Sequence, residues 1–152
     1  MLLSAESVRT LDVPLAALGG EVRVMATGLG DTAGPAEVRL MLGGASVVPP
    51  SPAHLDWTPT PGGGALVRWV RRSRVGWRWI DGVDAPLAEE SEAYGITLTH
   101  RDGSTETGET GTPAWPLDAA VLAEGPVTVS VRQRGTLGSS AAATIIITGQ
   151  EA

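Results

Sequence analysis

One stretch of the chain concentrates the residue types that could bind a ligand or catalyse a reaction: RRSRVGWRWIDGVDAPLAEESEAY, residues 71–94. Arginines come first, two tryptophans follow, and a block of aspartates and glutamates ends the stretch. Guanidinium groups bind carboxylates through paired hydrogen bonds and stack on aromatic rings. The side chains that we single out as a candidate contact loop are Arg71, Arg72, Arg74, Trp77, Trp79, Asp81 and Asp84.

Three non-catalytic interpretations fit this stretch. Its arginines and acids can pair across one long loop that shields the edge of a sheet. Trp77 and Trp79 can anchor a protein–protein contact, because tryptophan and arginine are enriched among the residues that dominate such interfaces. The same two tryptophans, with carboxylates nearby, can form a platform for a sugar. The sequence leaves these alternatives open.

Catalysis is the interpretation that the residue pattern disfavours. Asp81 and Asp84, or Glu89 and Glu90, are carboxylate pairs of the kind used in acid–base chemistry. Adjacent acids in a loop, however, are more often solvated or paired with arginine. The two histidines stand apart in the sequence, and there is no cysteine to act as a nucleophile or thiolate ligand. We therefore predict no enzymatic activity, no metal site and no cofactor.

Composition and charge narrow the possible partners. The 152-residue chain carries a formal net charge of −6, and its 11 basic residues are all arginine. A negative balance argues against duplex nucleic acid, which requires a basic face to neutralise phosphates. No apolar run approaches the roughly 20 residues that span a bilayer. We expect neither nucleic-acid binding nor membrane insertion.

The elements around the loop read as strands. Apolar and polar residues alternate within 65–72, 92–100 and 125–134, and turn-forming residues separate these runs. The run 141–148 is β-branched enough to be a strand with both faces partly covered. Shorter runs at 8–14, 20–27 and 36–48 also resemble strands. One segment, PLDAAVLAEG at 116–125, could be a short helix or a strand and a turn. The sequence thus predicts an all-β protein.

The chain is expected to divide near a proline-rich segment. Prolines remove hydrogen-bond donors from a sheet and favour an extended backbone, so we place a linker at 49–53. Residues 1–48 then form a small β-rich segment that is short for an independent core. Such a segment is expected to pack on the second domain, on another copy, or on another protein. Residues 54–149 form the main domain.

From about residue 54 onward, the chain resembles a fibronectin type III domain. The resemblance rests on Trp69 in the second strand, Tyr94 opening the third, and Leu122 and Gly125 leading into the sixth. The segment VTVSVRQRGTLGSSAAATIIITG resembles the last hairpin of the family. The resemblance as a whole implies an immunoglobulin-like sandwich of two antiparallel sheets. The link between the second and third strands, about 73–91, is much longer than the family usually has.

A narrower resemblance covers roughly residues 45–100. The segments PPSPAHL, VRWVRRSRVGW and DAPLAEESEAY are similar to the C-terminal region of tail-tip, or baseplate hub, proteins of siphophages and gene transfer agents. The resemblance implies a virion protein at the tail tip that binds other tail proteins or the host cell surface. It also implies a homo-oligomer, with three copies around an axis as one arrangement. The rival hypothesis is a carbohydrate-binding module that recognises host glycan through Trp77 and Trp79.

Overall fold

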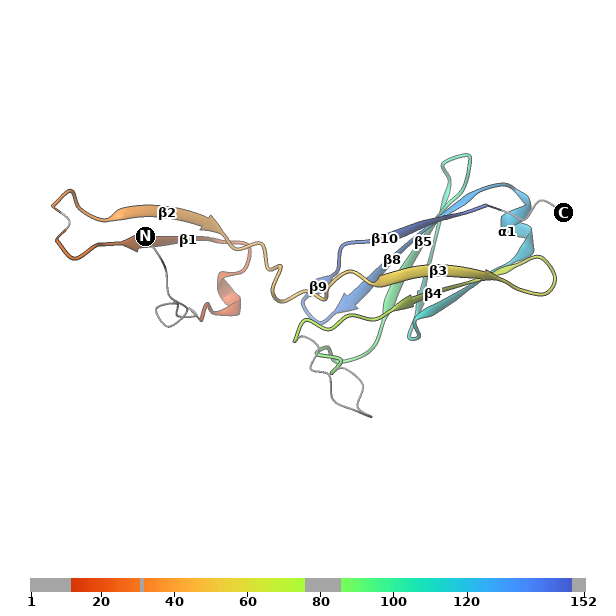
Figure 1. Cartoon of the computed structure of the whole chain (residues 1–152), viewed down its shortest axis with the longest axis horizontal. Coiled ribbons are helices and arrows are strands. Elements are labelled where there is room, and N and C mark those ends of the chain that lie inside the picture. The colour runs from red at the N-terminus through yellow and green to blue at the C-terminus, as the bar shows by residue number, and fades with distance from the viewer. Residues whose placement is uncertain (1–11, 31, 76–85, 149–152) are drawn as a thin grey trace. The chain divides into compact units, whose positions relative to one another are not determined.

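The computed structural model describes residues 12–30, 32–75 and 86–148. Contacts divide the chain into two compact units, Met1–Ala45 and Ser46–Ala152. The first contains a short 3-10 helix and a two-stranded sheet, and the second contains the remaining strands and one short helix (Figure 1). The protein is therefore all-β, as the alternating patterns predict.

The N-terminal unit is built on one antiparallel hairpin. The 3-10 helix η2 (Leu15–Ala17) precedes β1 (Glu21–Ala26), which pairs with β2 (Ala36–Met41). Both strands lie within runs that the sequence predicts as extended. The predicted strand at 8–14 lies mostly outside the described residues, and its described part, 12–14, is not a strand.

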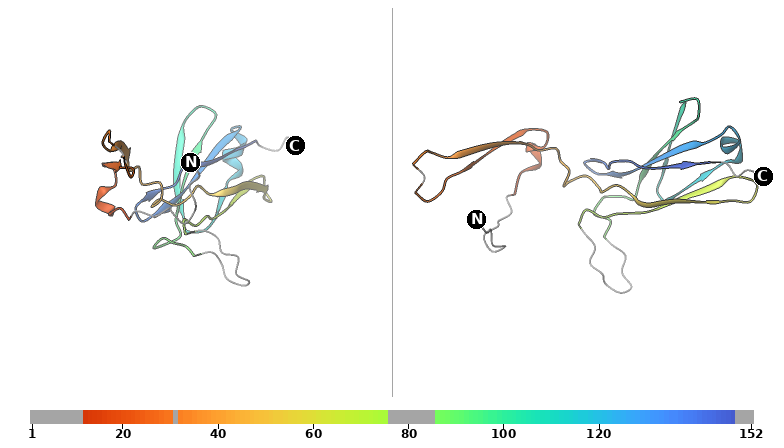
Figure 2. Two further views of the ribbon diagram at one scale, coloured as in Figure 1. Left: turned by 60° about the vertical axis from the view of Figure 1, so that its left-hand side comes forward. Right: turned by 45° about the horizontal axis from the view of Figure 1, so that its top comes forward.

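The second unit is a sandwich of two antiparallel sheets. One sheet has the order β3-β4-β7, and the other has the order β10-β8-β5-β6, with the short β9 paired to β8. The right-hand view of Figure 2 shows β3 and β4 in one layer and β8 and β10 in the other. The elements are β3 (Ala53–Pro59), β4 (Ala65–Val70), β5 (Tyr94–Thr99), β6 (Thr105–Thr110), β7 (Ala114–Leu117), α1 (Ala119–Ala123), β8 (Val127–Gly135), β9 (Gly138–Ser139) and β10 (Ala143–Ile147).

The core lies between these sheets and comes from the inward residues of each alternating strand. On β8, Val127, Val129 and Val131 are fully buried, while the residues between them are not. Trp69 of β4 meets Tyr94 of β5 edge to face, with ring centroids 5.0 Å apart at an interplanar angle of 75°. Such aromatic pairs stabilise by about 0.5–1.5 kcal/mol beyond the area that they bury. The resemblance correctly assigns Trp69 to the core, and it correctly places Tyr94 at the start of a strand.

Trp57 and Trp115 also face the sandwich interior. They lie on either side of Val67 across the three-stranded sheet and pack against the core. The Trp115 ring lies against Gly108 of β6, so closely that a Cβ at this position would lie 2.7 Å from Cζ2 of the ring. Gly108 therefore allows the two sheets to approach at this edge. Trp57 and Trp115 are packing residues.

Four strands were not among the runs predicted from the sequence: β3, β6, β7 and the two-residue β9. β3 lies partly in the proline-rich segment and carries a bulge, with His54 in the left-handed region at φ 50°. β6 reads TETGET and contains no large apolar residue, so its sequence gives no alternating signal. β7 spans four residues and contains a proline. The 116–125 segment forms both the end of β7 and the helix α1.

The proline-rich segment predicted as a linker belongs to the same compact unit as the sandwich. Pro49 and Pro52 are buried. Pro49 Cδ lies so close to Gly135 that a Cβ there would come within 2.6 Å of it, and Val48 approaches Gly138 almost as closely. The segment that leads into β3 is thus packed against the β8–β9 hairpin.

Candidate functional site

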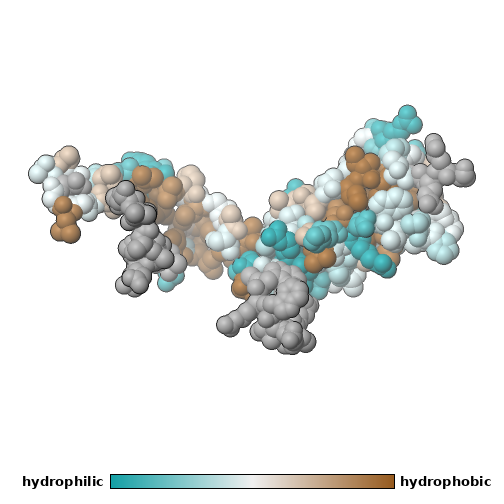
Figure 3. Space-filling view, viewed as in Figure 1, coloured by the Kyte–Doolittle hydropathy of each residue, from teal (hydrophilic) through white to brown (hydrophobic). Residues whose placement is uncertain are grey.

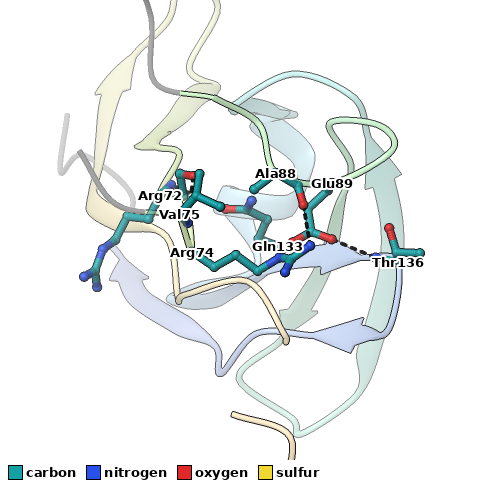
Figure 4. A network of polar contacts seen from close by, with 8 residues as sticks. Arg72, Arg74, Val75, Ala88, Glu89, Gln133 and Thr136 are labelled. Carbon is teal, nitrogen blue, oxygen red and sulfur yellow. Dashed lines mark hydrogen bonds and ion pairs between the residues drawn. The ribbon is translucent and has the colours of Figure 1, made fainter. Parts of the chain in front are cut away.

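The candidate contact loop connects β4 to β5, and the structure describes its two ends, 71–75 and 86–93. Trp77, Trp79, Asp81 and Asp84 of the predicted loop lie outside the described residues. The predicted residues Arg71, Arg72 and Arg74 lie in the described part, at the base of the loop beside the end of β8. The base can therefore be built up residue by residue (Figure 4).

Arg74 and Glu89 join the two ends of the loop. Arg74 Nε donates to Glu89 Oε1 at 2.7 Å, and Arg74 Nη2 donates to the backbone carbonyl of Ala88 at 2.6 Å. The other oxygen of Glu89, Oε2, accepts from the backbone N–H of Thr136 at 2.9 Å. The side chain of Glu89 is 2% exposed. Arg74, Glu89 and Thr136, with the carbonyl of Ala88, form what we call the loop clamp.

The electrostatics of the clamp favour a charged Glu89. Burial opposes ionisation and is the largest single influence on its pKa. The hydrogen bond from Thr136 and the guanidinium of Arg74 together outweigh burial, so the pKa of Glu89 lies below its ordinary value. A buried carboxylate is stable here because both of its oxygens have donors. This pairing of arginine with acid is one that the sequence predicts.

The clamp also holds a strained backbone. Ala88 has φ 61°, a left-handed conformation that costs a non-glycine residue about 1–2 kcal/mol. Its carbonyl accepts the hydrogen bond from Arg74. Such a conformation persists where surrounding contacts determine it, and here the two adjacent residues are held by the same guanidinium.

A buried amide supports the first end of the loop. Gln133 is 1% exposed, and its Oε1 accepts from the backbone N–H of Arg72 at 3.4 Å. Its backbone N–H donates to the hydroxyl of buried Ser140 at 2.9 Å, and Ser140 N–H donates to its carbonyl. The Arg72 guanidinium points away from this cluster in Figure 4 and is exposed. Arg72 is thus placed by its backbone, with its charge presented outward.

Sequence reasoning missed Gln133, Thr136 and Ser140. A signal for Gln133 exists in the run VTVSVRQR, where it occupies the next inward position after Val127, Val129 and Val131. A polar residue at an inward position requires hydrogen-bond partners. Thr136 contributes a backbone N–H, which no side-chain pattern indicates.

The loop clamp and the neighbouring Pro49 come from the three segments on which the tail-tip resemblance rests. Pro49 comes from PPSPAHL, Arg74 from VRRSR and Glu89 from DAPLAEE. Pro49 and Glu89 both press on Gly135: a Cβ there would lie 2.6 Å from Pro49 Cδ and 2.8 Å from Glu89 Oε2. Each of these three segments therefore contributes a structural residue to the base of the loop.

Tyr94 lies at the second end of the loop and is buried. Its hydroxyl donates to Glu92 Oε1 at 2.7 Å. Burial, followed by the hydrogen bond and negative charge of Glu92, raises the pKa of Tyr94 above its ordinary value. The phenol therefore stays protonated at neutral pH, which makes it a structural donor and not a base.

The hairpin of the N-terminal unit offers a second candidate surface. Its register places Val22 opposite Leu40 and Val24 opposite Val38, all on one face. Val24, Val38 and Leu40 are 41%, 55% and 51% exposed. We call these four residues the hairpin apolar face. Apolar atoms are visible over β1 and β2 in Figure 3.

The opposite face of the hairpin carries its charges. Arg39 pairs with Glu21 and Glu37, each at 3.2 Å, and Arg23 lies 3.8 Å from Glu37. Exposed pairs such as these contribute about 0–1 kcal/mol. Met25 and Met41 lie on this same face and are exposed, so the face is mixed, whereas the hairpin apolar face carries no charge.

The described residues offer neither a metal-binding cluster nor a membrane-spanning helix. Across 12–30, 32–75 and 86–148, no group of three His, Asp or Glu residues could hold a metal ion. Within the same ranges, no helix is long and apolar enough to cross a membrane.

Comparison with known proteins identifies a fold. No protein-family model matches the chain, and no curated protein matches it in sequence. Among solved structures, domains d3-d4 of the rat CD45 extracellular region align over 97% of this chain and 73% of theirs, with 11% identity and a TM-score of 0.51. The FN5 domain of Drosophila Lar aligns over 68% of this chain and all of its own, with 15% identity and a TM-score of 0.40. A myokine structure aligns over 68% of this chain and 99% of its own, with 16% identity and a TM-score of 0.48.

At these identities the likeness establishes the fold alone. The sandwich has the fibronectin type III-like architecture that the sequence predicts, with one three-stranded sheet and one five-stranded sheet that includes the short β9. Domains of this kind are typically non-catalytic. They present binding surfaces on loops and sheets around a rigid core.

Proposed function

We propose that the chain is a non-enzymatic structural and adhesive subunit of a phage-like tail tip, which binds other tail proteins or the host cell surface. The supporting observation is the contrast between a sandwich with a complete core and a hairpin whose apolar face is exposed. The tail-tip setting rests on the resemblance carried by PPSPAHL, VRRSR and DAPLAEE. The localisation is then the virion.

The hairpin is the assembly element in this proposal. A two-stranded sheet alone is marginally stable in water, because it has no second layer to cover its apolar side. Two hairpin apolar faces can stack as two layers and cover each other, whereas the charged faces stay in water. We therefore assign the hairpin apolar face to contact between copies of this chain. Stacking of two such faces gives a twofold contact, whereas the ring of three that the resemblance implies would need the three faces to meet at the axis.

Sedimentation velocity of the full chain tests this assembly. The wild type is expected to associate as its concentration rises, and Val24→Lys is expected to remain a monomer, because it places a charge in the hairpin apolar face. Met25→Lys is the matched control: it is the next residue along β1, lies on the charged face, and is opposite Glu37. A monomeric wild type, or equal association by both variants, would contradict the proposed contact.

Electron microscopy tests the tail-tip setting separately. An antibody raised against the sandwich and carrying a gold label is applied to negatively stained particles from the source cells. The label is expected at the distal end of the tail. Labelling of the head alone, or intact tailed particles that carry no label, would remove the tail-tip proposal and leave the assembly result standing.

A further inference from the structure

The outer face of the five-stranded sheet contains a polar groove that is separate from the loop clamp. It measures about 360 Å³, within the range of roughly 300–1,000 Å³ typical of small-ligand sites. Its lining comes from β5, β6, β8 and β9. Its lining includes Gly95, Thr97, Thr107, Glu109, Arg132 and Arg134.

Strand register explains why a hollow exists here. Gly95 of β5 is paired with Glu109 of β6 on one side and with Arg132 of β8 on the other. These three residues form one row across the outer face, and the middle one has no side chain. Thr107 and Thr97 form the next row. The groove therefore has a backbone floor between an acid and an arginine, with hydroxyl groups beside it.

Two arginines border the floor in different ways. Arg134 Nη2 pairs with Glu109 Oε1 at 2.6 Å, and a Cβ on Gly95 would lie 3.4 Å from Arg134 Nε, so Arg134 passes over the glycine. Both partners are about half exposed or more. An exposed pair contributes about 0–1 kcal/mol, so an incoming ligand can displace it at little cost.

Glu109, the acid of this row, pairs with Arg134, so the row has no second acid to pair with Arg132. Arg132 Nη1 donates to the carbonyl of Ser140 at 2.8 Å, and no ion pair to it occurs within the described residues. Ser140 is itself fixed, because it is 1% exposed and exchanges two hydrogen bonds with Gln133. The Arg132 guanidinium is therefore held in place while its remaining N–H groups stay available. This is the arrangement that binds a carboxylate in paired fashion.

We infer that this groove binds an acidic sugar, with Arg132 receiving the carboxylate and the threonines and Glu109 receiving the hydroxyls. A saccharide bearing a carboxylate matches the lining because it offers one anion and several hydroxyl groups. A protein anchor would need an apolar pocket, and the outward residues around the floor are polar. The inference names a ligand class for the adhesive part of the proposed function and rests on that part.

Calorimetric titration with a trisaccharide of galacturonic acid tests the inference, beside the neutral trisaccharide of galactose. The acidic sugar is expected to bind and the neutral one to bind at least about tenfold more weakly, since a charged hydrogen-bonded pair is lost. Arg132→Gln is expected to weaken acidic binding by a similar factor. Arg68→Gln is the matched control, because Arg68 is exposed on β4 of the other sheet.

A second variant examines the floor directly. Gly95→Val fills the groove and should abolish binding. The φ of Gly95 is not in the left-handed region, and the atoms nearest to a Cβ there belong to the flexible end of Arg134. Circular dichroism verifies that the variant is folded. Glycerol phosphate is titrated as an anion that is not a sugar acid. The inference would be overturned by equal affinity for both sugars, by unchanged binding to Arg132→Gln, by tighter binding of glycerol phosphate, or by no binding to the wild type.

The same preparations separate this inference from the assembly proposal. Sugar binding is measured on Val24→Lys as well as on the wild type. Binding that persists in a monomeric Val24→Lys supports the groove whatever the assembly state. Loss of binding in Val24→Lys with Arg132 intact would contradict a groove that is complete within one chain.

Discussion

The sandwich and the hairpin use the same alternating pattern to different ends. On β8, the apolar row of Val127, Val129 and Val131 is completely covered by the opposing sheet. On the hairpin, the equivalent row formed by Val24 and Val38 is about half exposed. An alternating strand therefore defines which face must be buried, but the presence of a second layer decides whether one chain can bury it. The proposed contact between copies would supply that second layer to the hairpin.

The largest expected effect is in the sandwich core. Trp69→Ala should lower the free energy of unfolding by about 3–5 kcal/mol, because it leaves a cavity and removes the aromatic contact with Tyr94. Val24→Ala on the hairpin should change it by no more than about 0.5 kcal/mol under dilute conditions. Urea denaturation followed by circular dichroism measures both. Equal losses would abolish the distinction between the two regions.

Loop anchoring should give the next largest effect. Glu89→Gln removes the negative charge from the loop clamp and is expected to cost about 1–3 kcal/mol at neutral pH, since a buried hydrogen-bonding group loses a charged partner. Glu90→Gln, next to it and exposed, is the matched control. Urea titrations of both variants measure the difference.

The pH dependence of that effect has a defined sign. The pKa of Glu89 is lower in the folded state than its ordinary 4.5. A lowered folded-state pKa contributes stability above the unfolded value, and that stability is lost as pH falls through the folded value. The gap between wild type and Glu89→Gln should therefore be full at pH 7 and shrink below about pH 4.5. A gap that grew on acidification would show that the carboxylate is not stabilised by Arg74.

The smallest expected effect concerns the tryptophans of the loop. Trp57, Trp69 and Trp115 face the interior, so the sugar platform considered from sequence depends on Trp77 and Trp79. Since we place the sugar site in the groove, Trp77→Ala and Trp79→Ala should leave binding on a glycan array unchanged. Loss of array binding in both variants, with Arg132→Gln unaffected, would favour the rival platform.

The fold could be predicted from the sequence where apolar and polar residues alternate and an aromatic residue occupies an inward position. β4, β5 and β8 each carry an apolar period of two, and Trp69 and Tyr94 mark the core. β10 was predicted from its run of β-branched residues. β6 was not accessible, because TETGET has no apolar row and is a strand by virtue of pairing with β5. β6 forms a strand because it pairs with β5, and its local sequence does not encode this pairing.

The candidate site was accessible in part for a similar reason. The pairing of arginine with acid across the loop was predicted by type, and Arg74 with Glu89 is one such pair. The groove was not predicted, because it results from the register that places Gly95 between Glu109 and Arg132. Register between strands distant in sequence is fixed by the packing of the whole sheet.

Hydrogen exchange at two concentrations tests the contrast between the regions most directly. In dilute solution, the amides of β8 are expected to be strongly protected and those of β1 and β2 to exchange at rates near those of unfolded peptides. At a concentration where the chain associates, β1 and β2 should gain protection and β8 should stay unchanged. Hairpin amides that are protected as strongly as β8 in dilute monomer would contradict the account, because the hairpin would then need no partner.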